Sequence, residues 1–203
     1  MFQKAIIQNV VSTSSLTEEK EKLDLNKLAA IIKNSKYRPD RFSALIIKIR
    51  EPIRATALLF SNGRIVCVGT KSVKDSKLAM QRFVDIISAT TTIRINIKGF
   101  NIQNIVSSFA FPGHLNLPGN TLHKIFLFLA LYDSLRIYPP VWLRRHISYN
   151  PEFFPGMCLR INDSRTIALV FTTGKCIITG AKSEDEIYLT QNLIYNSILT
   201  FLK

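Results

Sequence analysis

Two stretches of the chain, LLFSNGRIVCVGTKS at 58–72 and LVFTTGKCIITGAKS at 169–183, carry nearly the same pattern of residues. Two further segment pairs recur in the same order, IQNVVS at 7–12 with IQNIVS at 102–107 and YRPDRF at 37–42 with YNPEFF at 149–154. Two repeats are fewer than the three that an open repeat array needs, so the copies are expected to close as a pseudo-twofold pair. The sequence therefore predicts a first repeat over 1–95 and a second over 96–203.

Each repeat is dominated by the two-residue alternation that is typical of β-strands. The alternating segments are 5–13, 43–50, 55–60 and 64–69 in the first repeat and 100–108, 157–162, 166–171 and 175–180 in the second. Helices are predicted at 25–34, at 73–88 and from 183 onward. The apolar side of the second helix is predicted to contain Leu78, Met80, Phe83, Val84 and Ile87. Because an antiparallel sheet can leave one face uncovered, we predict an α+β fold with helices on one face only.

The strand alternation also predicts which side chains share the other face of the sheet. They are Asn9, Val11, Thr13, Thr56, Leu58, Phe60, Arg64, Val66 and Val68 in the first repeat and Asn104, Val106, Leu169, Phe171, Lys175, Ile177 and Thr179 in the second. Two readings stay open here, a binding face and the core of a two-layer sandwich. A binding face of this kind, apolar with two amides and a basic rim, suits the minor groove at A·T pairs, which offers only acceptors.

The net charge of the chain indicates a polyanionic partner. The chain has 27 Lys and Arg against 14 Asp and Glu, a net charge of +13. Nucleic acid is the commonest partner of such a surface, and an anionic membrane is the next. No apolar run approaches the ~20 residues of a membrane span, and the first residues lack the layout of a signal peptide.

No catalytic or metal-binding arrangement is legible in the sequence. The acidic residues are scattered, whereas a nuclease needs clustered carboxylates for its metal ions. The histidines, His114, His123 and His146, have no ligand spacing, so neither a metal nor another cofactor is expected. The cysteines, Cys67, Cys158 and Cys176, are predicted to be buried structural thiols of a reducing compartment. We therefore predict that the protein is not an enzyme, and a recognition domain of a nuclease or glycosylase is the competing reading.

Several of these motifs resemble the core domain of the TATA-box-binding protein family. They are QNVV, ALLFSNGR and CVGTKS in the first repeat and QNIVSS, SYNPEFFPG, LVFTTGK and ITGAKSEDEIY in the second. The resemblance covers nearly the whole chain, and an insertion at about 124–146 has no family counterpart. It implies a pseudo-twofold saddle, an antiparallel sheet of about ten strands with four helices on the convex face. The concave face would bind the minor groove.

The resemblance also implies roles for individual residues of this chain. Phe42 with Phe60, and Phe154 with Phe171, match the phenylalanines that wedge between base steps. The other positions that match DNA contacts are Asn9, Val11, Lys48, Leu58, Arg64, Val66, Val68, Asn104, Val106, Arg160, Leu169, Lys175, Ile177 and Thr179. Lys71 and Lys182 lie where the family approaches phosphates.

Four departures from the family pattern are visible, and one of them is Phe153, which follows Glu152 where a leucine is usual. Val68 stands where a threonine is usual, although its counterpart Thr179 is kept. The segment between Phe42 and Phe60 carries one extra residue, so that hairpin is expected to bulge. Glu152 is kept at the segment that contacts transcription factor IIB, but Asn150 replaces a second acid.

The resemblance thus predicts a general transcription initiation factor that binds and bends A·T-rich, TATA-type promoter DNA and nucleates a preinitiation complex. The implied partners are double-stranded DNA, proteins like transcription factors IIA and IIB, the RNA polymerase machinery and, without DNA, a second copy of the chain. The implied location is the nucleus, or the site of viral transcription for a virus-encoded protein. The alternative is a diverged relative that acts mainly through protein contacts with weak DNA specificity.

Overall fold

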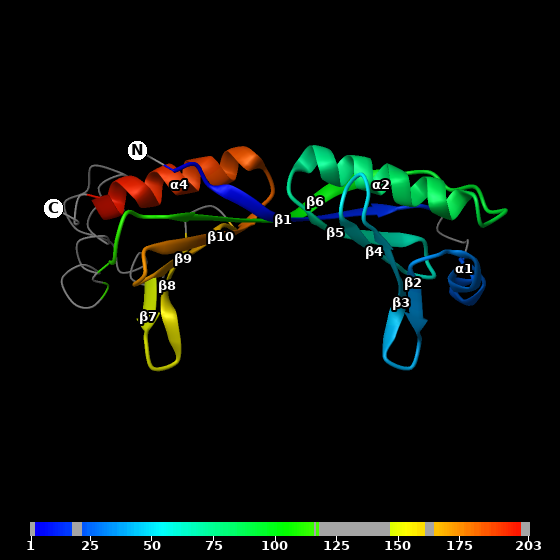
Figure 1. Cartoon of the computed structure of the whole chain (residues 1–203), viewed down its shortest axis with the longest axis horizontal. Coiled ribbons are helices and arrows are strands. Elements are labelled where there is room, and N and C mark those ends of the chain that lie inside the picture. Colours follow the sequence, from blue (N-terminus) through cyan, green and yellow to red (C-terminus); the bar gives the residue numbers. More distant parts are fainter. Residues whose placement is uncertain (1–2, 18–21, 116, 118–146, 161–164, 200–203) are drawn as a thin grey trace. The chain divides into compact units, whose positions relative to one another are not determined.

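Ten strands and three helices make up the part of the chain that the computed structural model describes, residues 3–17, 22–115, 117, 147–160 and 165–199 (Figure 1). The strands are β1 (Ile6–Ser15), β2 (Ser35–Arg38), β3 (Phe42–Ile49), β4 (Ala55–Leu59), β5 (Arg64–Thr70), β6 (Lys98–Ala110), β7 (Ile147–Asn150), β8 (Phe154–Arg160), β9 (Ile167–Phe171) and β10 (Lys175–Ala181). The helices are α1 (Leu25–Ile31), α2 (Val73–Ser88) and α4 (Glu184–Leu199). The strands form one sheet in the order β2-β3-β4-β5-β1-β6-β10-β9-β8-β7, which confirms the predicted α+β class and the sheet of about ten strands.

The chain divides into two compact units. The first unit is Ile7–Asn104, and the second contains Met1–Ile6 together with Ile105–Lys203. Strand β6 crosses the boundary, so its first residues belong to one unit and its last residues to the other. The fourth helix implied by the family and the whole insertion at 124–146 lie outside the described residues.

Strand register separates the two faces of the first unit. Ile47, Ala57, Cys67 and Ser12 lie opposite one another on β3, β4, β5 and β1, and all four are buried. Helix α2 packs on β4 and β5, and α1 packs on β2 and β3 (Figure 1). This row therefore belongs to the face that the helices cover, where burying one large apolar side chain stabilises the fold by about 1.5–3 kcal/mol.

Helix α2 begins as predicted but buries a different stripe. The Ser72 side chain accepts a hydrogen bond from the Asp75 backbone N–H at 2.9 Å, which satisfies one unpaired amide at the helix start. Leu78 was predicted to face the core but is 51% exposed, while Ser76 and Ala79 are buried. At 100° per residue, positions 76, 79, 80, 83 and 87 form one stripe and position 78 falls outside it. Leu78 was predicted to belong to the buried stripe only because it is hydrophobic, and its position on the helix was not considered.

A small polar cluster is buried beneath α2. The hydroxyl oxygens of Ser12 and Ser76 lie 2.7 Å apart, and both hydroxyls hydrogen-bond to the Cys67 thiol. Burial raises the pKa of Cys67 to about 11, and these hydrogen bonds offset only part of that effect.

The second unit builds the same position from apolar groups. By the repeat, the counterparts of Ser12, Cys67 and Ser76 are Ser107, Ile178 and Ile187, and all three counterparts are fully buried. The Ser107 hydroxyl finds no hydrogen-bond partner within the described residues. The duplicated units therefore share a fold but not the chemistry of their cores.

Several boundaries differ from the prediction. Strands β2 and β7 were not predicted, because each has only four residues and little apolar alternation. Helix α1 ends at Ile31 rather than at 34, since Ile32 is extended and Asn34 adopts a left-handed φ of 59° before β2. The extra residue between Phe42 and Phe60 does not bulge the hairpin. The β3–β4 register is unbroken, so the residue is accommodated in the connection at 50–54.

Candidate nucleic-acid interface

The first unit has an apolar sheet face on the side opposite its helices. Ile46, Leu58, Val66 and Thr13 form one row across β3, β4, β5 and β1, and each is half-buried. A second row contains Lys48, Thr56 and Val68. These side chains alternate with the buried helix-facing rows, as the pleat of a sheet requires. We call this surface the open face of the first unit.

The second unit repeats this arrangement on its own strands. One row contains Cys158, Leu169, Ile177 and Ser108, which are all half-buried. A second row contains Arg160, Ile167 and Thr179, of which only Arg160 is exposed. The same alternation leaves Val106 half-buried on β6. These residues form the open face of the second unit.

Each open face carries a pair of phenylalanine rings. The rings of Phe42 and Phe60 have centroids 6.4 Å apart, and those of Phe154 and Phe171 lie 5.9 Å apart, both at about 65°. Phe42 and Phe154 are each 43% exposed. The sequence-predicted partners are therefore brought together in both units, and each pair keeps an aromatic edge in solvent.

The second ring pair rests on a glycine. A Cβ atom at Gly156 would lie 2.7 Å from Cε1 of Phe154 and 2.9 Å from Cε1 of Phe171. The counterpart of Gly156 in the first unit is Ala44, where the rings are farther apart. The missing methyl group thus leaves room for the two rings of the second pair to lie closer together.

The amide of Asn9 has a fixed orientation. Its Oδ1 accepts a hydrogen bond of 2.8 Å from the Gly69 backbone N–H. The β1–β5 register shifts between Val10 and Ser12, and Gly69 adopts a φ of +96° that suits glycine. Because the oxygen is engaged, the NH₂ group is the part of this amide available to donate to a ligand. Asn104 occupies the corresponding half-buried position of the second unit, where Gly180 has a φ of +90°.

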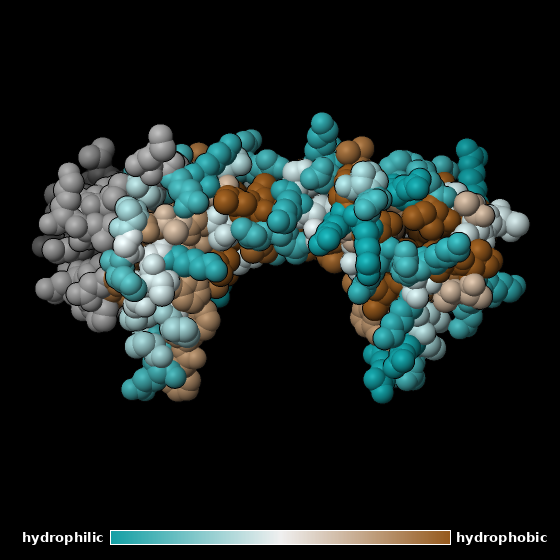
Figure 2. Space-filling model, in the orientation of Figure 1, coloured by the Kyte–Doolittle hydropathy of each residue, from teal (hydrophilic) through white to brown (hydrophobic). Residues whose placement is uncertain are grey.

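The predicted basic contacts are all exposed: Lys48, Arg64, Lys71, Arg160, Lys175 and Lys182. Within the described residues, ion pairs are found between Lys27 and Asp24 and between Arg41 and Asp40, so these six cations take part in none. Hydrophilic side chains cover much of the visible surface, including that over α2 (Figure 2). The positive charge is therefore available to an external anion.

The turn between β7 and β8 contains the predicted partner-binding residues. The Asn150 side-chain oxygen accepts a hydrogen bond of 3.2 Å from the Glu152 backbone N–H, and the Asn150 carbonyl accepts one of 3.1 Å from Phe153 N–H. Phe153 is 88% exposed. Asn150 therefore shapes the turn, and the turn presents Glu152 and Phe153 to solvent.

Four open-face residues were missed, namely Ile46, Cys158, Ser108 and Ile167, and one prediction for a cysteine was wrong. Ile46 lies in the apolar run Leu45–Ile47, where alternation is hidden; its pairing with Leu58 places it on the open face. Cys158 was predicted to be buried, but it is half-buried on the open face because it pairs with Leu169. Cys67 and Cys176 are buried, and burial raises the pKa of Cys176 to about 12.

Other kinds of site were sought in the described residues. No group of His, Cys, Asp and Glu side chains among them could hold a metal ion. Across the same residues, no helix has the length and apolar character needed to cross a membrane.

The fold and these faces define a class of duplicated antiparallel-sheet proteins, with helices on one face and paired phenylalanines on the other. The family described as Transcription factor TFIID (or TATA-binding protein, TBP) matches residues 4–90 and 141–201, and the chain belongs to this family. This is a family of DNA-binding transcription factors rather than of enzymes.

Individual relatives agree with this assignment. The chain is 38% identical over 198 residues to the TATA-box-binding protein of Spodoptera frugiperda, covering 97% of this chain and 56% of that protein. It is 37% identical to TATA box-binding protein-like 2 of Rattus norvegicus (97% and 50% covered) and 36% identical to TATA-box-binding protein 1 of Triticum aestivum (98% and 75% covered). The chain therefore spans about half the length of several relatives. Among solved structures, Methanococcus jannaschii TBP superimposes with a TM-score of 0.70 at 25% identity, covering 98% of this chain and 99% of that one.

Proposed function

We propose that this protein is a general transcription initiation factor that binds the minor groove of A·T-rich, TATA-type promoter DNA. The observation that carries the proposal is the pair of open faces, each apolar and each bearing a phenylalanine pair. At A·T pairs the minor groove presents only acceptors, so an apolar face with a few donors fits it. The NH₂ group of Asn9, whose oxygen is engaged by Gly69, is such a donor.

The phenylalanine pairs are proposed to bend the DNA. An aromatic edge inserted between two base pairs replaces part of the stacking that the kink removes. Unstacking costs a few kcal/mol per step and is easiest at TA steps, which gives sequence preference without base-specific contacts. The exposed edges of Phe42 and Phe154 are the groups that would enter first.

The two halves of the binding site are proposed to read DNA unequally. Val68 lies opposite Thr56 on the open face of the first unit, while Thr179 occupies the counterpart of Val68 in the second unit. The first unit therefore has no hydroxyl at a position where the second can donate. Its half-site would be recognised more by shape and apolar contact.

The proposed biological role is to nucleate a preinitiation complex in the nucleus, with proteins like transcription factors IIA and IIB and the RNA polymerase machinery. Family membership supports it. The solvent-exposed Phe153 beside Glu152 offers a protein-contact site on the β7–β8 turn. With Asn150 in the turn, that contact would rely on one carboxylate and an aromatic ring.

The test is a titration of a TATA duplex that reports bending by fluorescence energy transfer, with a G·C-scrambled duplex alongside. The parent chain should bend the TATA duplex only. The double variant Phe154→Ala, Phe171→Ala should abolish bending but keep salt-sensitive binding, because phosphate contacts supply most non-specific affinity. Phe153→Ala is the matched control, since this ring is exposed and outside the pair, and it should bend DNA normally. Normal bending by the double variant would remove the wedge role.

Val68 and Asn150 also favour a second candidate, a diverged factor that acts mainly through protein contacts. In the same titration, that candidate predicts equal, unbent and salt-labile binding to both duplexes by the parent chain. Selective bending of the TATA duplex would exclude it.

A further inference from the structure

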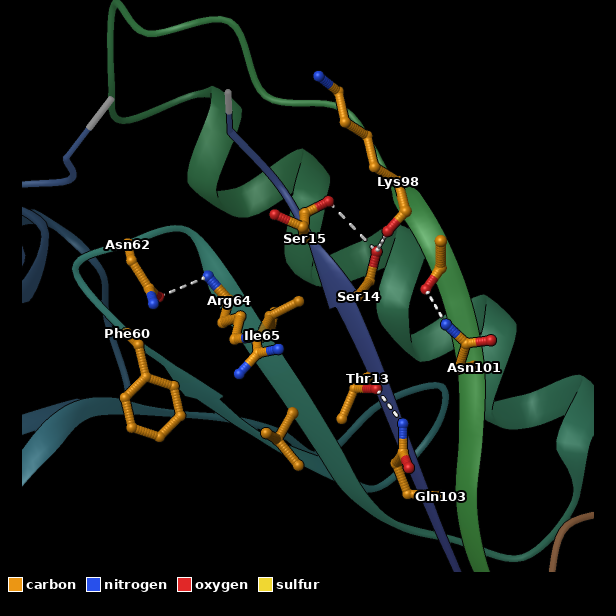
Figure 3. Close-up of a pocket in the computed structure, with 12 residues that line it drawn as sticks. Thr13, Ser14, Ser15, Phe60, Asn62, Arg64, Ile65, Lys98, Asn101 and Gln103 are labelled. Atoms are coloured by element: carbon orange, nitrogen blue, oxygen red, sulfur yellow. Dashed lines mark hydrogen bonds between the residues drawn. The ribbon is translucent and has the colours of Figure 1, made fainter. Parts of the chain in front are cut away.

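A cavity of about 660 Å³ opens beside Phe60 in the first unit. Figure 3 shows it between three strands: Lys98, Asn101 and Gln103 lie along β6 on one side, Thr13 to Ser15 on β1 in the middle, and Phe60, Asn62 and Arg64 on the other side. Neighbouring strands lie about 4.8 Å apart, so the cavity spans roughly 10 Å from β5 to β6. None of these β6 residues was among the sequence-predicted DNA contacts.

The polar groups of the cavity are held by hydrogen bonds within the protein. Gln103 Nε2 donates to Thr13 Oγ1 at 2.7 Å, and Asn101 Nδ2 donates to the Gly99 carbonyl at 2.7 Å. On the opposite side, Asn62 Oδ1 accepts from the Arg64 backbone N–H at 3.1 Å. The Asn62 oxygen is therefore engaged, and its NH₂ group remains a donor, as does the Thr13 hydroxyl.

The charged side chains that line the cavity are all positive. The residues that line it include two cations, Arg64 and Lys98, and no Asp or Glu. Fixed amide and hydroxyl donors beside an exposed guanidinium are the groups that bind phosphate oxygens. The chemistry of the lining therefore favours an anionic ligand with several acceptor oxygens.

The second unit lacks the corresponding groups. By the repeat, the counterparts of Lys98, Asn101 and Gln103 are Gln3, Ile6 and Gln8. A cation and an amide are thus replaced by an amide and an isoleucine that is 54% exposed. The polar and charged groups of this cavity are therefore specific to the first unit.

We propose that this cavity binds successive phosphates of one DNA strand next to the Phe42–Phe60 pair, with Lys98 and Asn101 as contacts added to Arg64. The inference rests on the proposed function. A length of ~10 Å accommodates two successive phosphates of one DNA strand, because these lie farther apart in space than the ~3.4 Å that separates them along the helix axis. Because only the first unit has these groups, the DNA ends are held unequally, and the protein gains a preferred orientation on a near-symmetric site.

The test compares salt dependence. The variant Lys98→Gln, Asn101→Ile places the second unit's residues in the cavity and leaves the Gln103–Thr13 hydrogen bond intact. Its plot of log K against log salt for a TATA duplex should be shallower by about 0.9, the value of one lost phosphate contact. Lys74→Gln is the control, because it removes an exposed cation from α2 on the helix-covered side and should leave the slope unchanged. Asn101→Asp should weaken binding more than Asn101→Ile does, because both lose the hydrogen bond to the Gly99 carbonyl but only the aspartate repels phosphate.

The outcomes distinguish this inference from the proposed function. Slopes equal to the Lys74→Gln control in both variants would overturn the cavity assignment even if the parent bends TATA DNA. If the parent chain binds DNA without bending it, and the double variant has a shallower plot of log K against log salt, the cavity assignment stands and the proposed function is rejected. A third experiment follows the nuclear magnetic resonance signals of the Asn101 and Gln103 side-chain amides. It compares the shifts caused by sodium phosphate with those caused by sodium chloride at equal ionic strength, and with those caused by the duplex. Shifts with inorganic phosphate but none with the duplex would make this a small-anion site and reject the DNA backbone as its ligand.

Discussion

Adding one methyl group at Gly156 should disturb the second phenylalanine pair without touching DNA directly. The new Cβ would lie 2.7 Å and 2.9 Å from the nearest carbons of Phe154 and Phe171, against an ordinary contact of about 3.5–4.0 Å. Gly156 is not among the glycines with a positive φ, so alanine fits its backbone. The perturbation is therefore steric, and the rings must move apart by several tenths of an ångström.

The expected size of the effect follows from the exposure of the rings. Overpacking a closed core typically costs about 1–3 kcal/mol, and a ring that is 43% exposed can swing outward, so we expect about 1 kcal/mol in unfolding free energy. If the rings enter DNA as wedges, an outward shift also misplaces the inserted edge. A tenfold weaker binding of bent TATA DNA would correspond to about 1.4 kcal/mol.

The assay combines urea unfolding with the bend-reporting titration. Gly156→Ala should lower the unfolding free energy slightly and weaken formation of the bent complex clearly. Ala44→Gly is the reciprocal control in the first unit: it should lower stability by about 1 kcal/mol through backbone entropy yet leave its ring pair free to insert. Unchanged bending affinity and unchanged stability for Gly156→Ala would refute the argument that this glycine sets the ring positions.

Two further predictions concern the cysteines. A thiol reagent at pH 8 should modify Cys158 first in the folded protein, because burial raises the pKa of Cys67 and Cys176 and keeps them protonated; TATA DNA should protect Cys158, and rapid reaction of all three thiols would contradict the assigned faces. Above pH 9 the unfolded Cys176 thiol ionises while the folded one, with a pKa of about 12, stays protonated, so stability should fall by about 1.4 kcal/mol per pH unit from this group. Urea unfolding between pH 9 and 11 should therefore show a flatter pH dependence for Cys176→Ala than for the parent, and equal slopes would count against the burial.

The strands that form the centre of each unit could be predicted because alternation there is strict. In the first unit Thr56, Leu58 and Val66 alternate with buried neighbours, and the sequence shows that alternation directly. Strand β2 has only four mostly polar residues, so its pairing with β3 depends on tertiary contact rather than on its own pattern. The prediction that Leu78 faces the core was wrong because it relied on residue type alone, and a hydrophobic residue on a helix can remain exposed.

The candidate site was predictable where residue type and spacing both carried information. The phenylalanine pairs followed from the repeat and the family resemblance, and the structure brings both pairs together. Ile46 and Cys158 could not be assigned to a face, because the strands that hold them are apolar on both sides. Lys98 and Asn101 were missed because a cavity formed by the ends of three strands has no signature in any one of them.

The buried hydroxyl and thiol cluster beneath α2 bears on how the duplicated chain avoids pairing its halves wrongly during folding. If α4 packed on the first unit's strands in place of α2, Ile187 would replace Ser76 opposite Ser12. The Ser12 hydroxyl would then lose Ser76 as a partner and keep only the Cys67 thiol, at a cost of about 0.5–1.5 kcal/mol for the lost hydrogen bond. With equilibrium constants changing tenfold for every 1.4 kcal/mol, that penalty suppresses the exchanged arrangement by about two- to tenfold. Because the two cores have diverged, each helix packs more favourably on the strands of its own unit than on those of the other.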